Sequence, residues 1–108
     1  MKVTKNVVYV VMGDTWTGNL FCSTTIEGIH DTLEGANEHL LQLIPDEKRR
    51  ILNARFDTSE EEMDKLLAFH CIEWSINTYS DGSKGFTIED KRQKHTTFLK
   101  IIERELLK

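Results

Sequence analysis

The sequence has few cysteines, the residues that stabilise small folds through disulfide bonds or bound metal ions. Its 108 residues contain two cysteines, Cys22 and Cys71, with no Cys-x-x-Cys pair and no Asn-x-Ser/Thr acceptor, which agrees with a reducing compartment. The longest apolar run, Val7 to Met12, is too short to span a bilayer, and the first residues lack the long apolar core of a signal peptide. We therefore expect an intracellular protein, cytoplasmic or nuclear, without contact to a membrane.

Positive charge is also scarce relative to negative charge. The chain carries 14 Lys and Arg against 18 Asp and Glu, and the net charge of −4 disfavours the phosphate attraction that dominates nucleic-acid binding. The charge is uneven: −1 over residues 1–56 (six basic, seven acidic), −7 over 57–90 (two and nine) and +4 over 91–108 (six and two). Either these charges meet within the fold or are solvated, or the basic end contacts an acidic partner.

The clearest element is a helix from Asp31 to Ile44. Hydrophobic residues make up 39% of the chain and charged residues 30%, so we expect one folded domain over residues 1–108. Asp31 or Thr32 can cap the helix, and Pro45 is expected to end it. Such a helix covers the apolar face of a sheet. Its apolar side consists of Leu33, Ala36, Leu40, Leu41 and Ile44.

Two strands are expected before this helix. Val7 to Met12 is apolar at both parities, so both faces of that strand need cover, and the second cover is a second helix layer, a curled sheet or another chain. Residues 13–19 predict a turn-rich loop in which Trp16 either folds over the sheet edge or anchors a partner. Residues 20–29 predict the next strand. Its alternation places four residues on one face: Leu20, Cys22, Thr24 and Ile26.

Two further helices are expected after Pro45. Pro45 itself is typical of a first helical position, and Thr58 with Glu61 has the spacing of a capping box. The first of these helices has a narrow apolar side formed by Ile51, Leu52 and Phe56. The apolar face of the second is formed by Met63, Leu66, Leu67, His70 and Cys71.

The remaining chain is typical of an antiparallel meander. Ile72 to Tyr79 and Phe86 to Glu89 alternate on either side of a glycine-containing turn. Residues 96–107 fit a strand and a helix alike, and the short loop at 91–95 favours a strand from Thr97 to Arg104. The predicted fold class is α+β: a mainly antiparallel sheet with the element order β-β-α-α-α-β-β-β and the helices packed on one face.

Four short segments resemble a loose group of small fungal proteins of unknown function. They are Val8-Tyr9-Val10-Val11, Thr32-Leu33-Glu34, Ala36-Asn37-Glu38 and the late Asp81-Gly82 turn. The resemblance implies two strands, a helical section and three strands. It implies no activity and no functional residue, and the charged segment from Asp46 to Phe69 departs from the shorter members of the group.

Residue types that could carry chemistry occur without a convergent pattern. His30-Asp31 and His70-Cys71 are neighbours in sequence, and neighbours on a strand point to opposite faces. We interpret Asp31 as a helix cap, His70 as a buried histidine and Cys71 as a core residue; zinc binding would need Cys22, His39 or a carboxylate to join them. A small enzyme using His30 or His70 is our third hypothesis. We assign no catalytic residue, metal or cofactor.

The basic turn, residues 91–95, is the best nucleic-acid candidate. Its cations are Lys91, Arg92 and Lys94, with residues 48–50 as a second basic cluster that could adjoin it. Aromatic residues on an exposed sheet face stack on bases, and Tyr79 is close in sequence, whereas Phe86 alternates with the buried set. A solvated turn is the alternative interpretation.

We predict a non-enzymatic interaction module or small adaptor subunit that binds a protein partner and can form a homodimer. The predicted partner-binding residues are Trp16, Tyr79, Lys91, Arg92 and Lys94. The alternative function is nucleic-acid binding through the basic turn.

Overall fold

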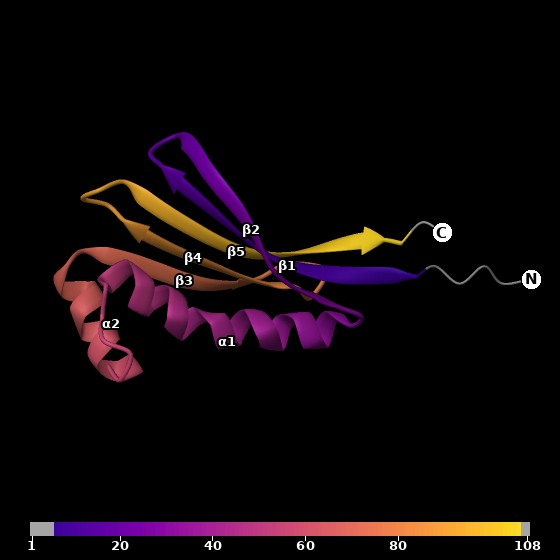
Figure 1. Ribbon diagram of the computed structural model, residues 1–108, viewed down its shortest axis with the longest axis horizontal. Helices are drawn as coiled ribbons and strands as arrows, with labels where there is room; N and C mark the ends of the chain where they lie inside the picture. Colours follow the sequence, from indigo (N-terminus) through magenta and orange to yellow (C-terminus); the bar gives the residue numbers. More distant parts are fainter. Residues whose placement is uncertain (1–5, 107–108) are drawn as a thin grey trace, which may run out of the picture.

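A computed structural model describes residues 6–106 and has the predicted α+β class. All five strands pair antiparallel in one sheet of order β2-β1-β5-β4-β3, and two helices lie on one side of it (Figure 1). The elements are β1 (Val7–Thr17), β2 (Leu20–His30), α1 (Leu33–Leu52), α2 (Glu60–Phe69), β3 (Ile72–Thr78), β4 (Lys84–Asp90) and β5 (His95–Glu105).

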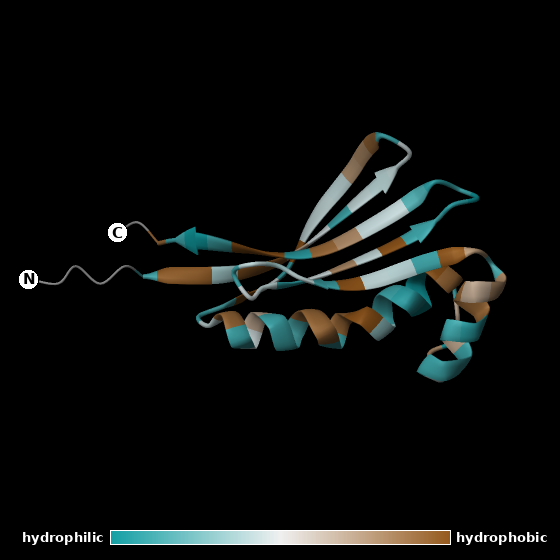
Figure 2. Cartoon of the chain, turned by 180° about the vertical axis from the view of Figure 1, so that it is seen from behind, coloured by the Kyte–Doolittle hydropathy of each residue, from teal (hydrophilic) through white to brown (hydrophobic). Residues whose placement is uncertain are grey.

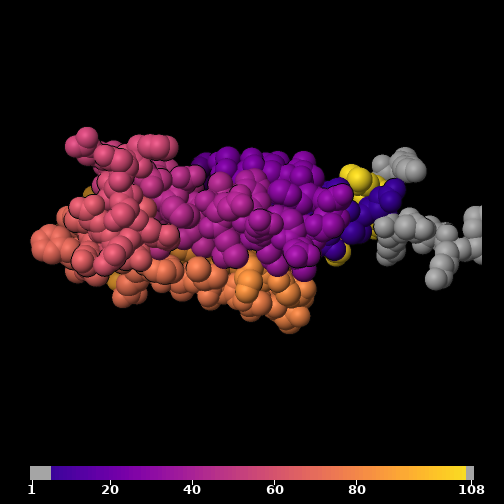
Figure 3. Space-filling model, turned by 90° about the horizontal axis from the view of Figure 1, so that it is seen from below, coloured from indigo at the N-terminus to yellow at the C-terminus, as the bar shows by residue number. Residues whose placement is uncertain are grey.

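Helix α1 runs along the sheet and seals the core. Its buried residues recur every four positions, which places them in one stripe: Ala36, Leu40, Ile44 and Lys48. The apolar members of that stripe pack on side chains from the middle of the sheet, among them Val11, Phe86, Ile88 and Leu99. In the space-filling view from below, α1 and α2 lie in front of the sheet, and the start of β1 and the end of β5 extend beyond α1 (Figure 3). Figure 2 shows brown, apolar segments both on α1 and on the strands of the sheet.

The predicted end of the helix at Pro45 is wrong, and so is the separate helix after it. Pro45 lies inside α1, which continues to Leu52 and ends at Asn53 with a left-handed φ of 51°. A proline inside a helix costs about 3 kcal/mol because one backbone hydrogen bond is lost and the ring meets the preceding turn. Here the helix continues beyond the proline because Ile51 and Leu52 pack against the core and Lys48 pairs with Glu60 and Asp64 of α2, and these contacts offset that cost.

Helix α2 begins one residue later than the predicted capping box. Ser59, not Thr58, is the N-cap, and its hydroxyl accepts a hydrogen bond of 3.2 Å from the Glu62 amide. Met63 and Leu67 are buried as expected.

His70 and Cys71, predicted to be buried, are exposed. The helix ends before them, and Cys71 takes a left-handed φ of 60° in the turn into β3, which directs both side chains away from the core.

Strand β1 is longer than predicted. Residues 13–17 continue the strand instead of forming a loop, and the chain reverses in two residues, Gly18 and Asn19. Gly18 has a φ of 61°, which glycine adopts without steric cost. Trp16 therefore sits in a strand.

Strand β2 does not alternate simply, which corrects the predicted face of Leu20, Cys22, Thr24 and Ile26. Val11 pairs with Gly28 and Met12 with Ile26, so Glu27 is an extra residue on β2. A second bulge at Cys22 separates the pairs formed by Thr15 and Trp16. Each bulge shifts by one residue which side chains share a face.

The meander of β3, β4 and β5 is confirmed, and the ambiguous segment is a strand. Trp74 pairs with Ile88, and Thr97 pairs with Ile88 from the other side. Leu107, the last residue of the ambiguous segment, lies outside the described residues. Asn37 of α1 fixes the β3–β4 turn: its side chain donates to the Gly82 carbonyl (3.0 Å) and accepts from the Lys84 amide (2.8 Å).

Candidate interaction face

Within residues 6–106, no helix or strand covers the side of the sheet opposite α1 and α2 (Figure 1). We call this side the open face. Strand alternation and the pairing register assign its residues. They are Val8, Val10, Met12, Asp14 and Trp16 from β1; Phe21, Thr24, Ile26 and Ile29 from β2; Thr96, Phe98, Lys100, Ile102 and Arg104 from β5; Gly85, Thr87 and Glu89 from β4; and Glu73, Ser75 and Asn77 from β3.

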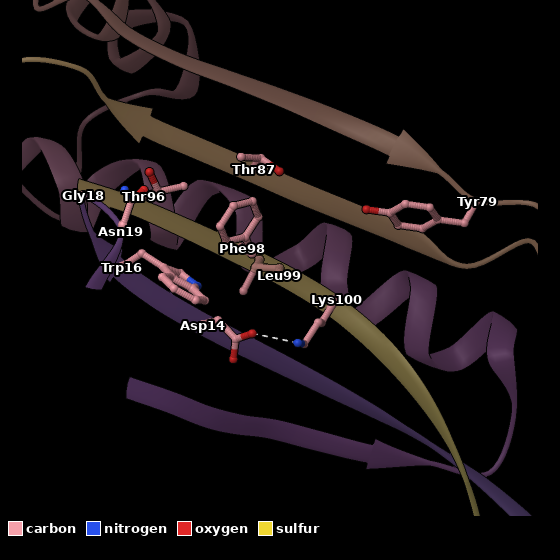
Figure 4. Close-up of a pocket in the computed structure, with 10 residues that line it drawn as sticks. All are labelled: Asp14, Trp16, Gly18, Asn19, Tyr79, Thr87, Thr96, Phe98, Leu99 and Lys100. Carbon is pink, nitrogen blue, oxygen red and sulfur yellow. Dashed lines mark ion pairs between the residues drawn. The ribbon is translucent and has the colours of Figure 1, made fainter. Parts of the chain in front are cut away.

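Part of the open face is hollowed, with a volume of about 510 Å³. Three aromatic side chains from different segments border the hollow: Trp16 from β1, Phe98 from β5 and Tyr79 from the end of β3 (Figure 4). Threonines 87 and 96 add hydroxyl groups between them. The hollow is wide and mostly apolar, so it suits bulky apolar groups better than a small polar metabolite.

The sequence predicted Trp16 and Tyr79 as binding residues, and the structure brings them to the same hollow. The Trp16 ring meets Phe21 edge to face, with centroids 5.4 Å apart. Tyr79 lies directly over Gly85, where an added Cβ would come within 2.7 Å of Tyr79 Cε2. Glycine at position 85 is therefore what lets the tyrosine ring lie flat against the sheet and border the hollow.

An ion pair crosses the floor of the hollow between β1 and β5. Lys100 Nζ is 2.7 Å from Asp14 Oδ2, and Thr24 Oγ1 donates to Asp14 Oδ1 at 2.7 Å. Burial alone would raise the pKa of Asp14, but the hydrogen bonds from Lys100 and Thr24 and the charge of Lys100 outweigh it and lower that pKa below its usual value. The pair neutralises the middle of the open face.

Aliphatic side chains cover the rest of the β2, β1 and β5 part of the open face. Ile26 and Ile29 are the most exposed of them, at 62% and 63%. Their cross-strand neighbours on β1 are Met12 and Val10, and Ile102 of β5 pairs with Val10 from the other side. This aliphatic patch and the aromatic hollow lie on either side of the polar group formed by Thr24, Asp14 and Lys100, so the open face carries two apolar areas around a neutral ion pair.

The basic turn lies at the end of the sheet, beside the β1–β2 turn. The Gly18 amide donates to the Lys94 carbonyl at 2.7 Å, and Lys94 has a left-handed φ of 57°. Arg92 Nη2 is 4.0 Å from Cys71 Sγ. Of the five predicted binding residues, the three basic ones, Lys91, Arg92 and Lys94, lie at the end of the sheet and do not line the hollow, and Arg92 lines a small cavity on the helix side with Ile51, Leu52 and Ile72.

Lys91 offsets a repulsion between two glutamates of the sheet. Glu73 and Glu89 are directly opposite one another on β3 and β4, an unfavourable pair of like charges. Lys91 Nζ lies 3.1 Å from Glu73 Oε2, and the hydrogen bond to Glu73 and its charge raise the pKa of Lys91 above the usual lysine value. Part of the basic end of the chain thus meets the acidic segment inside the molecule.

The second basic cluster does not adjoin the basic turn as a free cationic surface. Lys48 is buried, with its ammonium 2.9 Å from Asp64 and 3.2 Å from Glu60. Its two neighbours in sequence form ion pairs with acidic residues one turn earlier on α1, Arg49 with Asp46 and Arg50 with Glu47. The expectation that residues 48–50 extend a phosphate-binding patch is not met.

The histidines form a pair that sequence reasoning missed. His30 Nε2 and His39 Nδ1 are 2.8 Å apart, joining β2 to α1, and Gly28 leaves room for them because a Cβ there would meet His39 at 2.5 Å. Thr32 caps the helix, so Asp31 does not have the capping role that we predicted for it. Among the described residues, no group of three His, Cys, Asp or Glu side chains is placed to hold a metal ion.

Phe98 is the residue of the hollow that sequence reasoning missed on the open face. It is 38% exposed and lies between the buried Thr97 and Leu99. The alternation of Thr97, Leu99 and Ile101 with Phe98, Lys100 and Ile102 was the available signal. The same residues also fit helical spacing, which hides this signal in the sequence.

Comparison of the chain with protein-family models, with curated proteins and with solved structures gives no significant match. No helix in residues 6–106 is long and apolar enough to cross a membrane. The resemblance to small fungal proteins stays a prediction, and the functional argument rests on the open face.

Proposed function

We propose that this protein is a non-enzymatic interaction module, a small adaptor that binds a protein through the open face. The observation that carries the proposal is an uncovered sheet face with two exposed apolar areas, the aromatic hollow and the aliphatic patch, on either side of the Asp14–Lys100 ion pair. Trp16 and Tyr79 are its aromatic anchors, Lys91 lies at its rim beside Glu73, and the rest of the basic turn, Arg92 and Lys94, lies at the adjoining end of the sheet.

The exposed apolar side chains of the open face support a macromolecular partner. Exposed apolar patches on monomeric proteins rarely exceed a few hundred Å², and larger ones mark interfaces. Here Ile26 and Ile29 expose more than 60% of their surface, and Phe21, Phe98 and Tyr79 are also exposed. Aromatic anchors bordered by polar groups are typical of the residues that dominate protein binding.

The charge of the open face also favours a protein over a polyanion. Asp14 is paired with Lys100, and Lys91 offsets Glu73, which leaves Glu89 and Arg104 with opposite signs. A surface without net charge gains little from phosphate groups, whereas apolar burial needs no net charge.

The experiment is recovery of partners with the tagged protein from cells that also express an untagged copy. Trp16→Ala and Phe98→Ala each shorten an aromatic side chain on the open face, and Phe69→Ala shortens an exposed one on α2, on the other side of the sheet. We expect recovery of the bound protein, whether a different chain or the untagged copy, to fall about tenfold or more in the first two variants. Recovery with Phe69→Ala should match wild type.

If both face variants keep every partner while remaining folded by circular dichroism, the open face is not the binding surface. Repeating the recovery after nuclease treatment separates a direct protein partner from one bridged by nucleic acid.

Nucleic-acid binding is the second candidate, and one observation favours it. The aromatic hollow and the basic turn lie at the same end of the sheet, tied by the hydrogen bond between Gly18 and Lys94, so a single strand could stack on the rings while its phosphates meet Lys94. The test is fluorescence anisotropy with a labelled single-stranded RNA. Affinity that changes neither with added salt nor in the triple variant Lys91→Gln/Arg92→Gln/Lys94→Gln would end this candidate.

A further inference from the structure

We propose that the protein covering the open face is a second copy of this chain, and that two molecules pack face to face as a two-layer β-sandwich with the helices outside. This inference rests on the proposed function, because it names the occupant of the same surface. Sheets packed in this way lie about 10 Å apart and interdigitate their apolar side chains. The distribution of apolar residues, the area of the face and its charges support the second copy.

Strand β1 carries the first argument. Its residues Tyr9 and Val11 face α1, whereas Val8, Val10 and Met12 are apolar on the open face. A strand with one solvated face alternates apolar with polar residues, and an apolar run at both parities is typical of a strand covered on both sides. Because α1 and α2 both lie on one side, the second cover comes from outside the described chain.

The area of the open face is sufficient for a stable dimer. Three strands have 11 residues and two have seven. At about 3.4 Å per residue and about 4.8 Å between strands, they present roughly 750 Å² in projection. Accessible surface exceeds projected area because side chains stand out from the sheet. A specific interface buries about 800 Å² per partner, so the open face alone can supply it.

The charges of the open face are compatible with a second copy of the same face. Asp14 and Lys100 sit near its middle, and the Lys100 side chain remains 41% exposed although it is paired. The ammonium has three donors and the carboxylate several acceptor positions, so the pair can bond its equivalent across a two-fold axis without leaving either charge unpaired. Because the face carries charges of both signs and no net charge, two copies of it neither attract nor repel one another overall. The burial of apolar side chains then determines whether they associate.

The edge of β2 is a weaker candidate for self-association than the face. An exposed edge strand can pair with another chain through its free backbone groups. The two bulges at Cys22 and Glu27 interrupt the regular ladder and increase the local twist, which is a common way of blunting an edge. The same bulges leave Ile26 and Ile29 on the open face.

The test is the molar mass by light scattering after size exclusion, at 1 to 100 µM, of wild type and of two matched double variants. Ile26→Lys/Ile29→Lys adds two charges on the open face at side chains more than 60% exposed, so the single molecule should still fold. Leu41→Lys/Phe69→Lys adds the same two charges at exposed apolar positions on the helices. We expect wild type and the helix variant at twice 12.5 kDa. The dimer of the face variant should be weakened on the order of 100-fold or more, since lysines would be buried without partners.

Wild type at 12.5 kDa throughout, or a dimer that survives in the face variant, would overturn the second copy as occupant. So would equal loss of the dimer in both double variants. If Ile26→Lys/Ile29→Lys lacks the circular dichroism of wild type, Ile29→Lys alone repeats the test. The proposed function stands apart: a monomer that recovers a different protein through Trp16 and Phe98 refutes the second copy and keeps the interaction module.

Discussion

Neutralising two surface acids should destabilise this protein more than removing the buried base between them. Lys48 of α1 is 1% exposed, and its ammonium contacts Glu60 and Asp64 of α2 while lying 3.7 Å from the centre of the Trp74 ring of β3. The carboxylates are different, because their side chains are 54% and 44% exposed. One lysine thus links three elements, and water reaches the two sides of the ion pair unequally.

The unequal exposure sets the order of the effects. In Lys48→Met the stem is replaced by an apolar chain of similar length, and both carboxylates can hydrate, so we expect a loss of about 1 kcal/mol, mainly the cation–π contact. In Glu60→Gln/Asp64→Asn the ammonium stays buried with neutral acceptors only. Removing the partner of a buried charge typically costs about 3 to 5 kcal/mol, and the remaining amide oxygens place this variant near 3 kcal/mol.

The assay is urea unfolding followed by circular dichroism, with the free energy of unfolding compared at constant protein concentration. The triple variant Lys48→Met/Glu60→Gln/Asp64→Asn is the control, because the acids have no buried charge to serve once Lys48 is gone. Its stability should lie close to that of Lys48→Met. A larger loss in Lys48→Met than in the double acid variant would refute the reasoning, since it would mean that packing of the lysine stem, and not its charge, dominates.

Three other substitutions test the open face and the basic turn. The pKa of Asp14 is lower in the folded protein than its usual value near 3.9, so its ionised form stabilises the fold above about pH 4, and this stability is lost as the pH falls through the folded pKa. In Asp14→Asn the free energy of unfolding should therefore depend less on pH in the acid range than in wild type. Parallel curves for the two proteins would contradict the ion pair. Gly85→Ala should push Tyr79 off the sheet and reduce partner recovery as Tyr79→Ala does, while unfolding changes by less than about 1 kcal/mol because that ring is exposed and can move. Lys94→Gly should raise the free energy of unfolding by about 0.5 to 1 kcal/mol, since a left-handed φ is strained for lysine, and a loss of stability would show that the lysine side chain matters more than its backbone.

Local patterns predicted the sheet well where one face is buried and the other is polar. In β3 and β4 the apolar residues alternate with polar ones as predicted, and the structure places Ile72, Trp74, Phe86 and Ile88 together on the helix side. Such strands are readable because a shift of one residue would expose the whole apolar set. The α+β class followed from these strands and the helix.

Local patterns failed where tertiary burial outweighed a local preference. Pro45 is a strong helix terminator by itself, but the stripe that begins at Ala36 continues to Lys48, and burial of that stripe holds the helix together across the proline. The contact between His30 and His39 was equally invisible, because it depends on how β2 approaches α1.

The open face could be only partly predicted because the side chains of β2 do not alternate strictly between the two faces of the sheet. Strict alternation would separate Ile26 from Ile29 and Phe21 from Thr24, since each pair is three residues apart. The bulges at Cys22 and Glu27 each insert one residue, and all four side chains then point to the side away from α1. Two irregularities that look like defects of the strand therefore assemble the apolar surface on which the proposed function depends, and they do so on the strand whose edge they also protect.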